Sequence, residues 1–296
     1  MKKALGIPLI LVFILAIVVV LSGCTSPTPT ATPIASVTPA PNATVTPVPN
    51  ATTAPNFTTL KAGVIQIPVD TTFPPMEWLN TSLSGQDQFV GFDMDLMRAM
   101  AKKLNVSVEF ISSPWTTILT DVESGKYDCS ISSWSVTPAR QEVLLFSDPY
   151  YEIQQSMCVR KTDDSIQNWT DIVDKNKIVA CQMSTTGSTV AHNLTGANGT
   201  KISTANIKEF ESGEQAYDEL KKGTADVVIN DVVVSVYEVT TYPAEFKFTG
   251  SKWPIKEPYA IILPKSNTKL AAALNWAIEQ VKADGTYDQL KTKYNL

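Results

Sequence analysis

The sequence predicts an α/β fold with two lobes, each built on a mainly parallel sheet. Three observations support this prediction. Short β-branched runs alternate with amphipathic helical segments from about residue 60 to the C-terminus, and such alternation is typical of parallel sheets covered by helices. The alternation runs through two rounds, which indicates two lobes. About 240 residues follow the low-complexity N-terminal part, and this length is enough to bury two cores.

Residues 1–23 predict an export signal. Two lysines follow Met1, an apolar run covers 4–21, and Leu-Ser-Gly leads to Cys24, an order that is typical of secretory signals. The position of the cysteine resembles a lipobox, in which the thiol is lipidated and becomes the mature N-terminus. We therefore expect a lipoprotein held on the extracytoplasmic face of the cell membrane through Cys24. The alternative is an uncleaved helix anchor, because about 18 apolar residues can just span a bilayer.

Residues 24–58 predict a Pro/Thr-rich, glycosylated stalk, in which Pro-Asn-Ala-Thr occurs at 41–44 and again at 49–52. Frequent proline removes backbone donors and favours extended chain, so no core is expected here. Eight of the fourteen asparagines of the chain lie in Asn-X-Ser/Thr, a pattern that marks surface positions in exported proteins. These glycosylation candidates are Asn42, Asn50, Asn56, Asn80, Asn105, Asn168, Asn193 and Asn198.

Charge and cysteine content argue against several classes of function. The net charge is −5, with 24 basic and 29 acidic residues, and the lack of a basic stretch argues against a nucleic-acid partner. Cys129, Cys158 and Cys181 do not have the spacing of metal ligands, so the sequence predicts no metal site and no cofactor. We expect buried thiols on strands. The alternative is a Cys158–Cys181 disulfide, which an extracytoplasmic compartment permits and which the sequence alone does not decide.

Apolar periodicity predicts the elements in chain order. Met94, Met97 and Leu104 recur at helical spacing in the first helix, and Gly125 and Gly223 are expected to end two others. The first round is a strand at 64–69, a helix at 92–104, a strand at 106–111, a helix at 115–124 and a strand at 128–134. The second round is a strand at 178–182, helices at 188–194 and 213–222, a strand at 226–229 and a helix at 232–240, and an amphipathic helix at 268–281 follows it.

Hydroxyl groups and one arginine lie at the end of the strand predicted at 128–134 and in the loop after it. A guanidinium can hold a carboxylate in a bidentate pair while hydroxyls complete its shell. Arg140 is therefore the candidate anion ligand, with Ser132, Ser133 and Ser135 beside it. The alternative is a surface arginine next to a Ser/Thr turn.

Other candidates also follow strands, where ligands of open α/β sheets bind. Asp70 comes after the first strand, and Phe73 and Trp115 are candidate apolar walls. The alternative for each aromatic, and the commoner one for such residues taken singly, is a place in the core. Thr186 lies in a hydroxyl-rich turn before a helix, whose amides suit an anion. Asp231 follows a strand and is either a helix N-cap or the partner of an ammonium group.

Five motifs occur in order along the chain: GFDMDL at 91–96, SGKYD at 124–128, TPAR at 137–140, FSDPYY at 146–151 and ADGTY at 283–287. Together they resemble the polar amino-acid-binding family of periplasmic solute-binding proteins (solute-binding protein family 3), which serves ABC importers, over about residues 60–294. The resemblance implies a periplasmic-binding-protein-like fold of type II. Lobe 1 would comprise 59–151 plus 258–296, lobe 2 would comprise 152–257, and two strands near 151–155 and 252–260 would form the hinge.

The resemblance also implies roles, position by position. Arg140 would hold the α-carboxylate of the ligand and Asp231 its α-ammonium. Ser184 departs from the glycine usual in the family, which puts the backbone approach near Thr186 in doubt. The positions that would surround the ligand carboxylate are Ser133, Ser135 and Thr186. Those that would line the part of the site around the ligand side chain are Asp70, Phe73, Trp115, Ser132 and Gln182.

The function implied by the resemblance is that of an extracytoplasmic, monomeric substrate-binding protein. It would capture a polar amino acid by hinge closure and deliver it to the permease and ATPase of an ABC transporter. The alternatives are a cyclohexadienyl dehydratase-like enzyme and a tethered chemosensory ligand-binding module. The chain has a single histidine, His192, and no nucleophile–base set, so no catalytic residue is predicted. Because Asp70 favours an amide, ammonium or guanidinium, we rank Gln, Arg, Lys and His above Glu and Asp.

Overall fold

The computed structural model describes residues 53–296, which belong to one compact unit. The signal predicted at 1–23, Cys24, most of the predicted stalk, and the sequons at Asn42 and Asn50 lie outside the described residues. Within 53–296, no helix is both long enough and apolar enough to cross a membrane.

Strands and helices alternate along most of the described chain. The strands are β1 (Val64–Val69), β2 (Thr72–Phe73), β3 (Glu77–Leu79), β4 (Phe89–Val90), β5 (Ser107–Ser112), β6 (Leu144–Phe146), β7 (Tyr151–Arg160), β8 (Val179–Gln182), β9 (Ile207–Phe210), β10 (Val227–Asp231), β11 (Phe246–Tyr259) and β12 (Ile262–Pro264). The helices are α1 (Phe92–Lys103), α2 (Trp115–Glu123), α3 (Pro138–Val143), α4 (Trp169–Asp174), α5 (Thr186–Asn193), α6 (Gly213–Lys222), α7 (Val232–Thr241), α8 (Thr268–Ala283) and α9 (Thr286–Tyr294), with short 3-10 turns η1 (Gly85–Gln88) and η2 (Thr204–Asn206).

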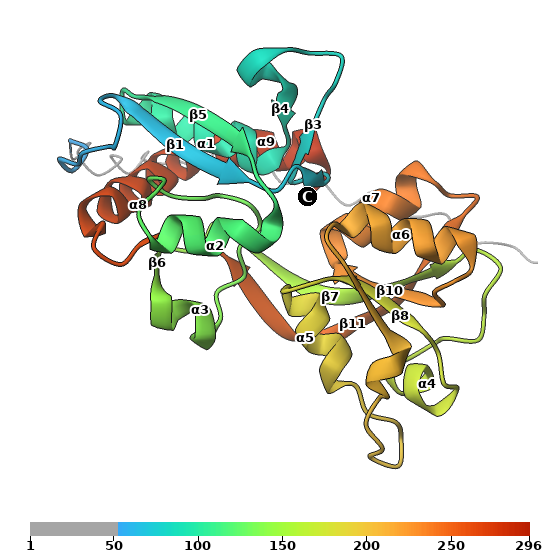
Figure 1. Ribbon diagram of the computed structural model, residues 1–296. Helices are drawn as coiled ribbons and strands as arrows, with labels where there is room; N and C mark the ends of the chain where they lie inside the picture. Colours follow the sequence, from blue (N-terminus) through green and yellow to red (C-terminus); the bar gives the residue numbers. More distant parts are fainter. Residues whose placement is uncertain (1–52) are drawn as a thin grey trace, which may run out of the picture. The chain divides into compact units, whose positions relative to one another are not determined.

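Figure 1 shows these elements in two lobes. The first lobe contains β1–β6, β12, α1–α3, α8 and α9, and the second contains β8–β10 and α4–α7. In the first lobe β1 and β5 pair in parallel, from Val64↔Ser107 to Val69↔Ser112. β12 pairs antiparallel with β6, and β2, β3 and β4 form a small antiparallel sheet. The C-terminal helices α8 and α9 contact α1, so both ends of the described chain belong to the first lobe.

The second lobe is built on a five-stranded sheet with the order β11-β7-β10-β8-β9. β8 runs parallel to both β9 and β10, whereas β7 is antiparallel to β10 and β11. β7 and β11 pair with each other from Phe246↔Arg160 to Tyr259↔Tyr151. Figure 1 shows these two long strands running from one lobe to the other.

Helix α1 illustrates how the sequence builds this core. Its apolar residues recur at helical spacing, and Met94, Met97 and Met100 are fully buried. Gly91 precedes the helix with φ of 130°, and a Cβ at this position would lie 2.1 Å from the backbone oxygen of Met76. Only glycine fits this close approach, so the glycine of the GFDMDL motif fixes how α1 follows β4.

The predicted α/β fold is confirmed, and all elements predicted from apolar periodicity but one lie within two residues of their observed bounds. The two hinge strands, expected near 151–155 and 252–260, are longer and cover Tyr151–Arg160 and Phe246–Tyr259. β1 and α6 have the bounds predicted for them, 64–69 and 213–222. The strand predicted at 128–134 is wrong, because this segment pairs only through isolated bridges such as Ser130↔Ile262. Ser133 there has φ of 52° and donates its backbone N–H to the Asp93 side chain. The chain leaves the extended conformation in order to satisfy this buried carboxylate.

The three described cysteines are buried and unpaired. β10 lies between β7, which carries Cys158, and β8, which carries Cys181. Strands two places apart are about 9.5 Å from each other, which is beyond the roughly 4.4–6.8 Å between Cα atoms of a disulfide. The two thiols also belong to different hydrophobic clusters, so the disulfide left open by the sequence is excluded.

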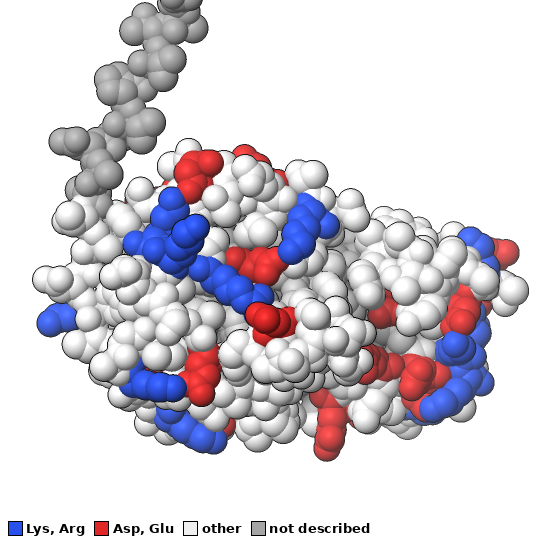
Figure 2. Space-filling view, turned by 90° about the horizontal axis from the view of Figure 1, so that it is seen from above, with Lys and Arg blue, Asp and Glu red and all other residues white. Residues whose placement is uncertain are grey.

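The surface carries charges of both signs. Figure 2 shows Lys and Arg interspersed with Asp and Glu in small groups on the face it presents, with wide uncharged areas between them. Among the sequons at 53–296, Asn80 is half-buried. The exposed ones are Asn56, Asn105, Asn168, Asn193 and Asn198.

Candidate ligand-binding site

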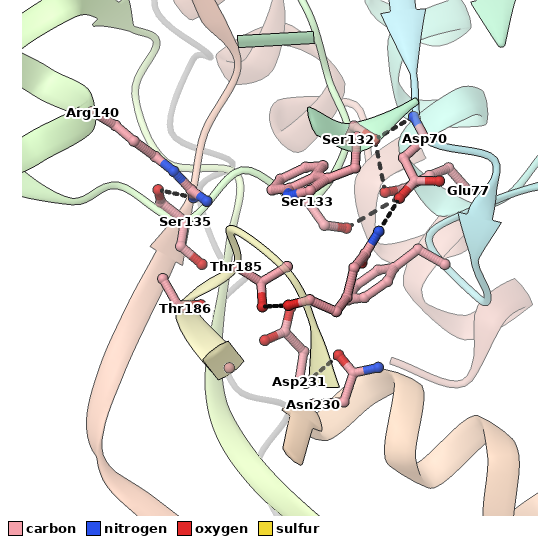
Figure 3. Close-up of a pocket in the computed structure, with 14 residues that line it drawn as sticks. Asp70, Glu77, Ser132, Ser133, Ser135, Arg140, Thr185, Thr186, Asn230 and Asp231 are labelled. Carbon is pink, nitrogen blue, oxygen red and sulfur yellow. Dashed lines mark hydrogen bonds between the residues drawn. The ribbon is translucent and has the colours of Figure 1, made fainter. Parts of the chain in front are cut away.

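A cavity of about 360 Å³, counting space open to solvent, is lined by residues of both lobes. Figure 3 shows Arg140 at one end, Asp70 and Glu77 at the other, and Asp231 below them. All ten residues predicted to bind a ligand line the cavity: Asp70, Phe73, Trp115, Ser132, Ser133, Ser135, Arg140, Gln182, Thr186 and Asp231.

Arg140 is held in place by the start of α3 and by two tryptophans. The Thr137 side chain caps α3 by accepting a hydrogen bond from the Arg140 backbone N–H, and Pro138 follows in the first turn. Trp115 and Trp134 stack with ring centroids 4.1 Å apart. The Arg140 guanidinium lies 4.9 Å from the Trp134 ring and 5.5 Å from the Trp115 ring. These cation–π contacts orient the planar guanidinium at the cavity wall.

The Arg140 guanidinium keeps donors for a ligand. Nη1 donates to the backbone oxygen of Ser135 at 2.9 Å, and Nη2 donates to that of Ser184 at 3.3 Å. No carboxylate of residues 53–296 lies within ion-pair distance of it. Burial lowers the pKa of Arg140 to about 10, against the opposing charges of Asp231 and Glu257, so the group stays charged at neutral pH. A charged fork without a counter-ion in the described chain suits a carboxylate.

The turn before α5 brings the second lobe to the same end of the cavity. Ser184 adopts φ of 59°, a left-handed conformation that glycine adopts more easily than serine. Its carbonyl accepts hydrogen bonds from Arg140 and from the Trp115 indole N–H, the latter at 3.3 Å. Thr185 caps α5 by accepting from the Ser188 backbone N–H. The serine therefore keeps the backbone conformation that the expected glycine would supply.

Asp231 lies at the end of β10 and is only 6 % exposed. It stands at the N-cap position of α7, but its side chain makes no capping hydrogen bond. The carboxylate instead accepts hydrogen bonds from the Gln155 amide and the Tyr259 hydroxyl. Burial, and then the charge of Glu257, raise the pKa of Asp231 to about 7. An ammonium group beside it would favour the ionised carboxylate.

Asp70 and Gln182 connect the lobes at the opposite end. The Gln182 amide donates to the Asp70 carboxylate at 2.7 Å and to the backbone oxygen of Glu211 at 3.0 Å. Asp70 also accepts from the Thr72 hydroxyl at 2.8 Å, and its backbone N–H donates to the Ser132 hydroxyl at 3.0 Å. Burial raises the pKa of Asp70 despite these hydrogen bonds, so this end of the cavity favours a cation or a donor.

Two further buried carboxylates accompany Asp70. Glu77 accepts from the hydroxyls of Ser132 and Ser133 at 3.0 and 3.1 Å, and Asp93 accepts from the Ser133 backbone N–H at 2.9 Å. Burial and then repulsion by Asp93 and Asp70 raise the pKa of Glu77 well above its ordinary value. Burial raises the pKa of Asp93 to about 7. A cationic group entering this end would relieve the repulsion between these carboxylates.

Four residues that line the cavity were not predicted from the sequence: Glu77, Thr185, Gly187 and Asn230. Glu77 belongs there because the β2–β3 pairing places it opposite Phe73, and no sequence pattern indicates that contact. The other three are direct neighbours in sequence of predicted residues, and this position next to Thr186 or Asp231 could have indicated that they line the cavity.

The cavity thus offers three charge environments to one ligand. Arg140 suits an anion, Asp231 suits a cation, and Asp70 with Glu77 suits a second cation or an amide. Among residues 53–296, no cluster of His, Cys, Asp and Glu is arranged to hold a metal ion. The arrangement suits a zwitterion that carries a polar or cationic extension.

The chain is similar to known proteins in both sequence and fold. The sequence model of the family described as bacterial extracellular solute-binding proteins, family 3, matches residues 65–296. A probable histidine-binding protein of Neisseria gonorrhoeae is 32 % identical over 232 residues, which cover 78 % of this chain and 82 % of that protein.

Solved structures show the same fold. An ancestral arginine-binding protein, solved with bound arginine, is 35 % identical with a TM-score of 0.70, and the match covers 78 % of this chain and 98 % of that one. An ancestral arginine-binding protein bound to glutamine is also 35 % identical with a TM-score of 0.70. An ancestral amino acid-binding protein that is a precursor of cyclohexadienyl dehydratase is 30 % identical with a TM-score of 0.68, over 78 % of this chain and 95 % of its own. These structures confirm the predicted two-lobed fold.

Proposed function

Because the chain belongs to the bacterial extracellular solute-binding proteins, family 3, we propose that it captures a polar amino acid outside the cytoplasm. It then delivers this ligand to the permease and ATPase of an ABC importer. The relatives reported above are described as histidine-, arginine- and amino acid-binding proteins, and we propose no catalytic step for this chain.

One observation carries the proposal: two unlike charged groups line one cavity, and neither forms an ion pair within residues 53–296. Arg140 is a charged guanidinium supported by two tryptophans. Asp231 is a buried carboxylate contributed by the other lobe. An α-carboxylate on Arg140 and an α-ammonium on Asp231 would satisfy both at once. Ser135 and Thr186 would complete the carboxylate shell, and Ser133, whose hydroxyl donates to Glu77 at 3.1 Å, would join them by turning toward the carboxylate.

Ligand capture would proceed by hinge closure. We propose lobe boundaries at 59–151 plus 258–296 and at 152–257, with the crossing strands β7 and β11 as the hinge. A ligand that touches Arg140 in one lobe and Asp231 in the other stabilises the closed population. We propose that the chain works in this way as a monomer.

The substrate class follows from the far end of the cavity. Asp70, Glu77 and Gln182 would meet the ligand side chain, with Phe73 and Trp115 as apolar walls. Carboxylates at this end favour a guanidinium, ammonium, imidazolium or amide and repel a second carboxylate. We therefore propose L-arginine, L-lysine, L-histidine and L-glutamine as substrates, ahead of L-glutamate and L-aspartate.

Calorimetric titration of the full-length chain in detergent with this panel of amino acids tests the substrate class. Replacing Asp70 with asparagine is expected to weaken L-arginine at least about tenfold, because charged hydrogen bonds contribute roughly 1.5–3 kcal/mol. L-glutamine should change much less, since the variant removes charge and keeps the shape. Equal losses for both ligands would show that Asp70 has a structural role only. Binding of no amino acid by the wild-type chain would contradict the proposed function.

Attachment to the membrane and glycosylation belong to the same proposal. Cys24 follows Leu-Ser-Gly after an apolar run, and lipidation there would keep the binding protein near its importer. The exposed sequons are candidate glycosylation sites, and none of them lines the cavity. Glycans at these positions would leave the ligand site open.

Replacing Cys24 with serine tests the anchor. If the thiol is lipidated, the variant should leave the membrane fraction or be mislocalised, because the lipid that holds the chain is missing. Fractionation and immunodetection of wild type and variant give the measurement. Unchanged retention of the variant with membranes would instead favour the uncleaved helix anchor.

A further inference from the structure

A second cavity, of about 1330 Å³ counting space open to solvent, shares no lining residue with the amino-acid cavity and adjoins it at Thr72, whose hydroxyl donates to Asp70. Residues around the β2–β3 hairpin of the first lobe form one wall, including Thr72 and Trp78. Helices α6 and α7 of the second lobe, and the segment after α7, form the rest. Nothing in the proposed amino-acid site accounts for this cavity.

Carboxylates outnumber cations among its lining residues. Glu214, Asp218, Glu238 and Glu245 line it, against a single lysine, Lys221. Lys221 forms an ion pair with Glu245 at 2.8 Å. Within residues 53–296, the other three carboxylates have no partner at ion-pair distance, so the cavity carries uncompensated negative charge.

Glu238 is the member of this set that a structural role does not explain. It is 8 % exposed, and its carboxylate accepts no hydrogen bond from residues 53–296. Burial and then the charges of Glu214, Asp218 and Glu245 raise its pKa to about 7. The carboxylate oxygens face the solvent of the cavity. An unpartnered carboxylate with a raised pKa in a cavity is a candidate ligand contact.

The shape of the cavity indicates what kind of cation it fits. Trp78 and Tyr237, with ring centroids 6.3 Å apart, and Tyr242 provide aromatic surface, which attracts ammonium groups and packs against methylene chains. The carboxylates are spread over two helices, Glu214 and Asp218 on α6 and Glu238 on α7. They form no cluster arranged to hold a metal ion, so the fitting ligand is an elongated organic cation.

We propose that this cavity binds a linear organic cation with two ammonium groups, such as a diamine. One ammonium group pairs with Glu238, the other lies at Glu214 and Asp218, and the methylene chain packs on Trp78 and Tyr237. Because the walls come from both lobes, the bound diamine favours the closed arrangement.

Titration calorimetry with cadaverine on the full-length chain in detergent tests the site. Cadaverine has no carboxylate, so the Arg140 end of the amino-acid cavity offers it nothing. We expect saturable binding that Glu238→Gln weakens at least about tenfold, since a buried charge partner is lost. The matched control Glu245→Gln removes a carboxylate already paired with Lys221 and should have a smaller effect. Asp231→Asn, in the other cavity, should leave cadaverine binding unchanged.

Three results would overturn the proposal. The first is the absence of cadaverine binding to the wild-type chain. The second is loss of binding in Asp231→Asn with binding kept in Glu238→Gln, which would place cadaverine in the amino-acid cavity. The third is equal binding by Glu238→Gln and the wild type. The thermal unfolding midpoint of Glu238→Gln should equal or exceed that of the wild type, because the variant no longer buries a group that ionises, and this shows that it is folded.

Discussion

Replacing Arg140 with alanine is expected to weaken amino-acid binding by at least about thirtyfold. Truncating one partner of a buried, hydrogen-bonded charge pair typically costs roughly 2–5 kcal/mol, and about 1.4 kcal/mol corresponds to a factor of ten. Recognition of a carboxylate at this wall needs a permanent charge and a planar fork of donors, and arginine supplies both. Calorimetry on the full-length chain with the best-bound amino acid of the panel gives the measurement.

The matched control is Arg140→Lys, which keeps the charge and loses the fork. It should recover only part of the lost affinity, because lysine cannot donate in a bidentate way. Thermal stability without ligand should stay close to wild type in both variants, since within residues 53–296 the Arg140 side chain makes only two hydrogen bonds, to the backbone oxygens of Ser135 and Ser184. An alanine variant that binds as tightly as the wild type would refute the carboxylate assignment.

The elements with strong local signals could be predicted from the sequence. α6 has its predicted bounds because Ser212 caps its start and Gly223 ends it in a left-handed conformation, and both signals are local. β1 was recognisable as a β-branched run that ends before Asp70. The ligand-site residues that follow strands were predictable for the same reason, because the ends of parallel strands meet at one edge of a sheet.

What could not be predicted depends on contacts between distant segments. At 128–134, Cys129 and Ile131 alternate with polar residues as in a strand. However, Ser133 turns its backbone N–H to the buried Asp93 carboxylate, 40 positions away in sequence. Glu77 enters the cavity only because β2 and β3 pair. The uncompensated charge of Glu238 results from the packing of α6, α7 and β2–β3, and a lone glutamate in a helix gives no sign of it.

Asp231 is expected to make amino-acid binding depend on pH. Burial raises its pKa to about 7, so below that pH the carboxyl must lose a proton before it can pair with the ligand ammonium. Affinity for L-arginine, whose positive groups stay charged between pH 5 and 8, should therefore fall as the pH drops below about 7. The steepest fall expected from one such group is about tenfold per pH unit.

Replacing Asp231 with asparagine distinguishes this effect from unfolding of the protein at low pH. At pH 8 the variant should bind L-arginine at least about thirtyfold more weakly, because the buried partner of the ammonium is lost. Its affinity should also fall less steeply between pH 8 and pH 5, and the remaining slope would belong to Asp70, Glu77 and Asp93, whose pKa values are raised as well. Calorimetry across this pH range on both proteins gives the comparison. If the variant kept both the affinity and the full pH slope of the wild type, Asp231 would not be the ammonium partner, and the ligand would have to be oriented differently in the cavity.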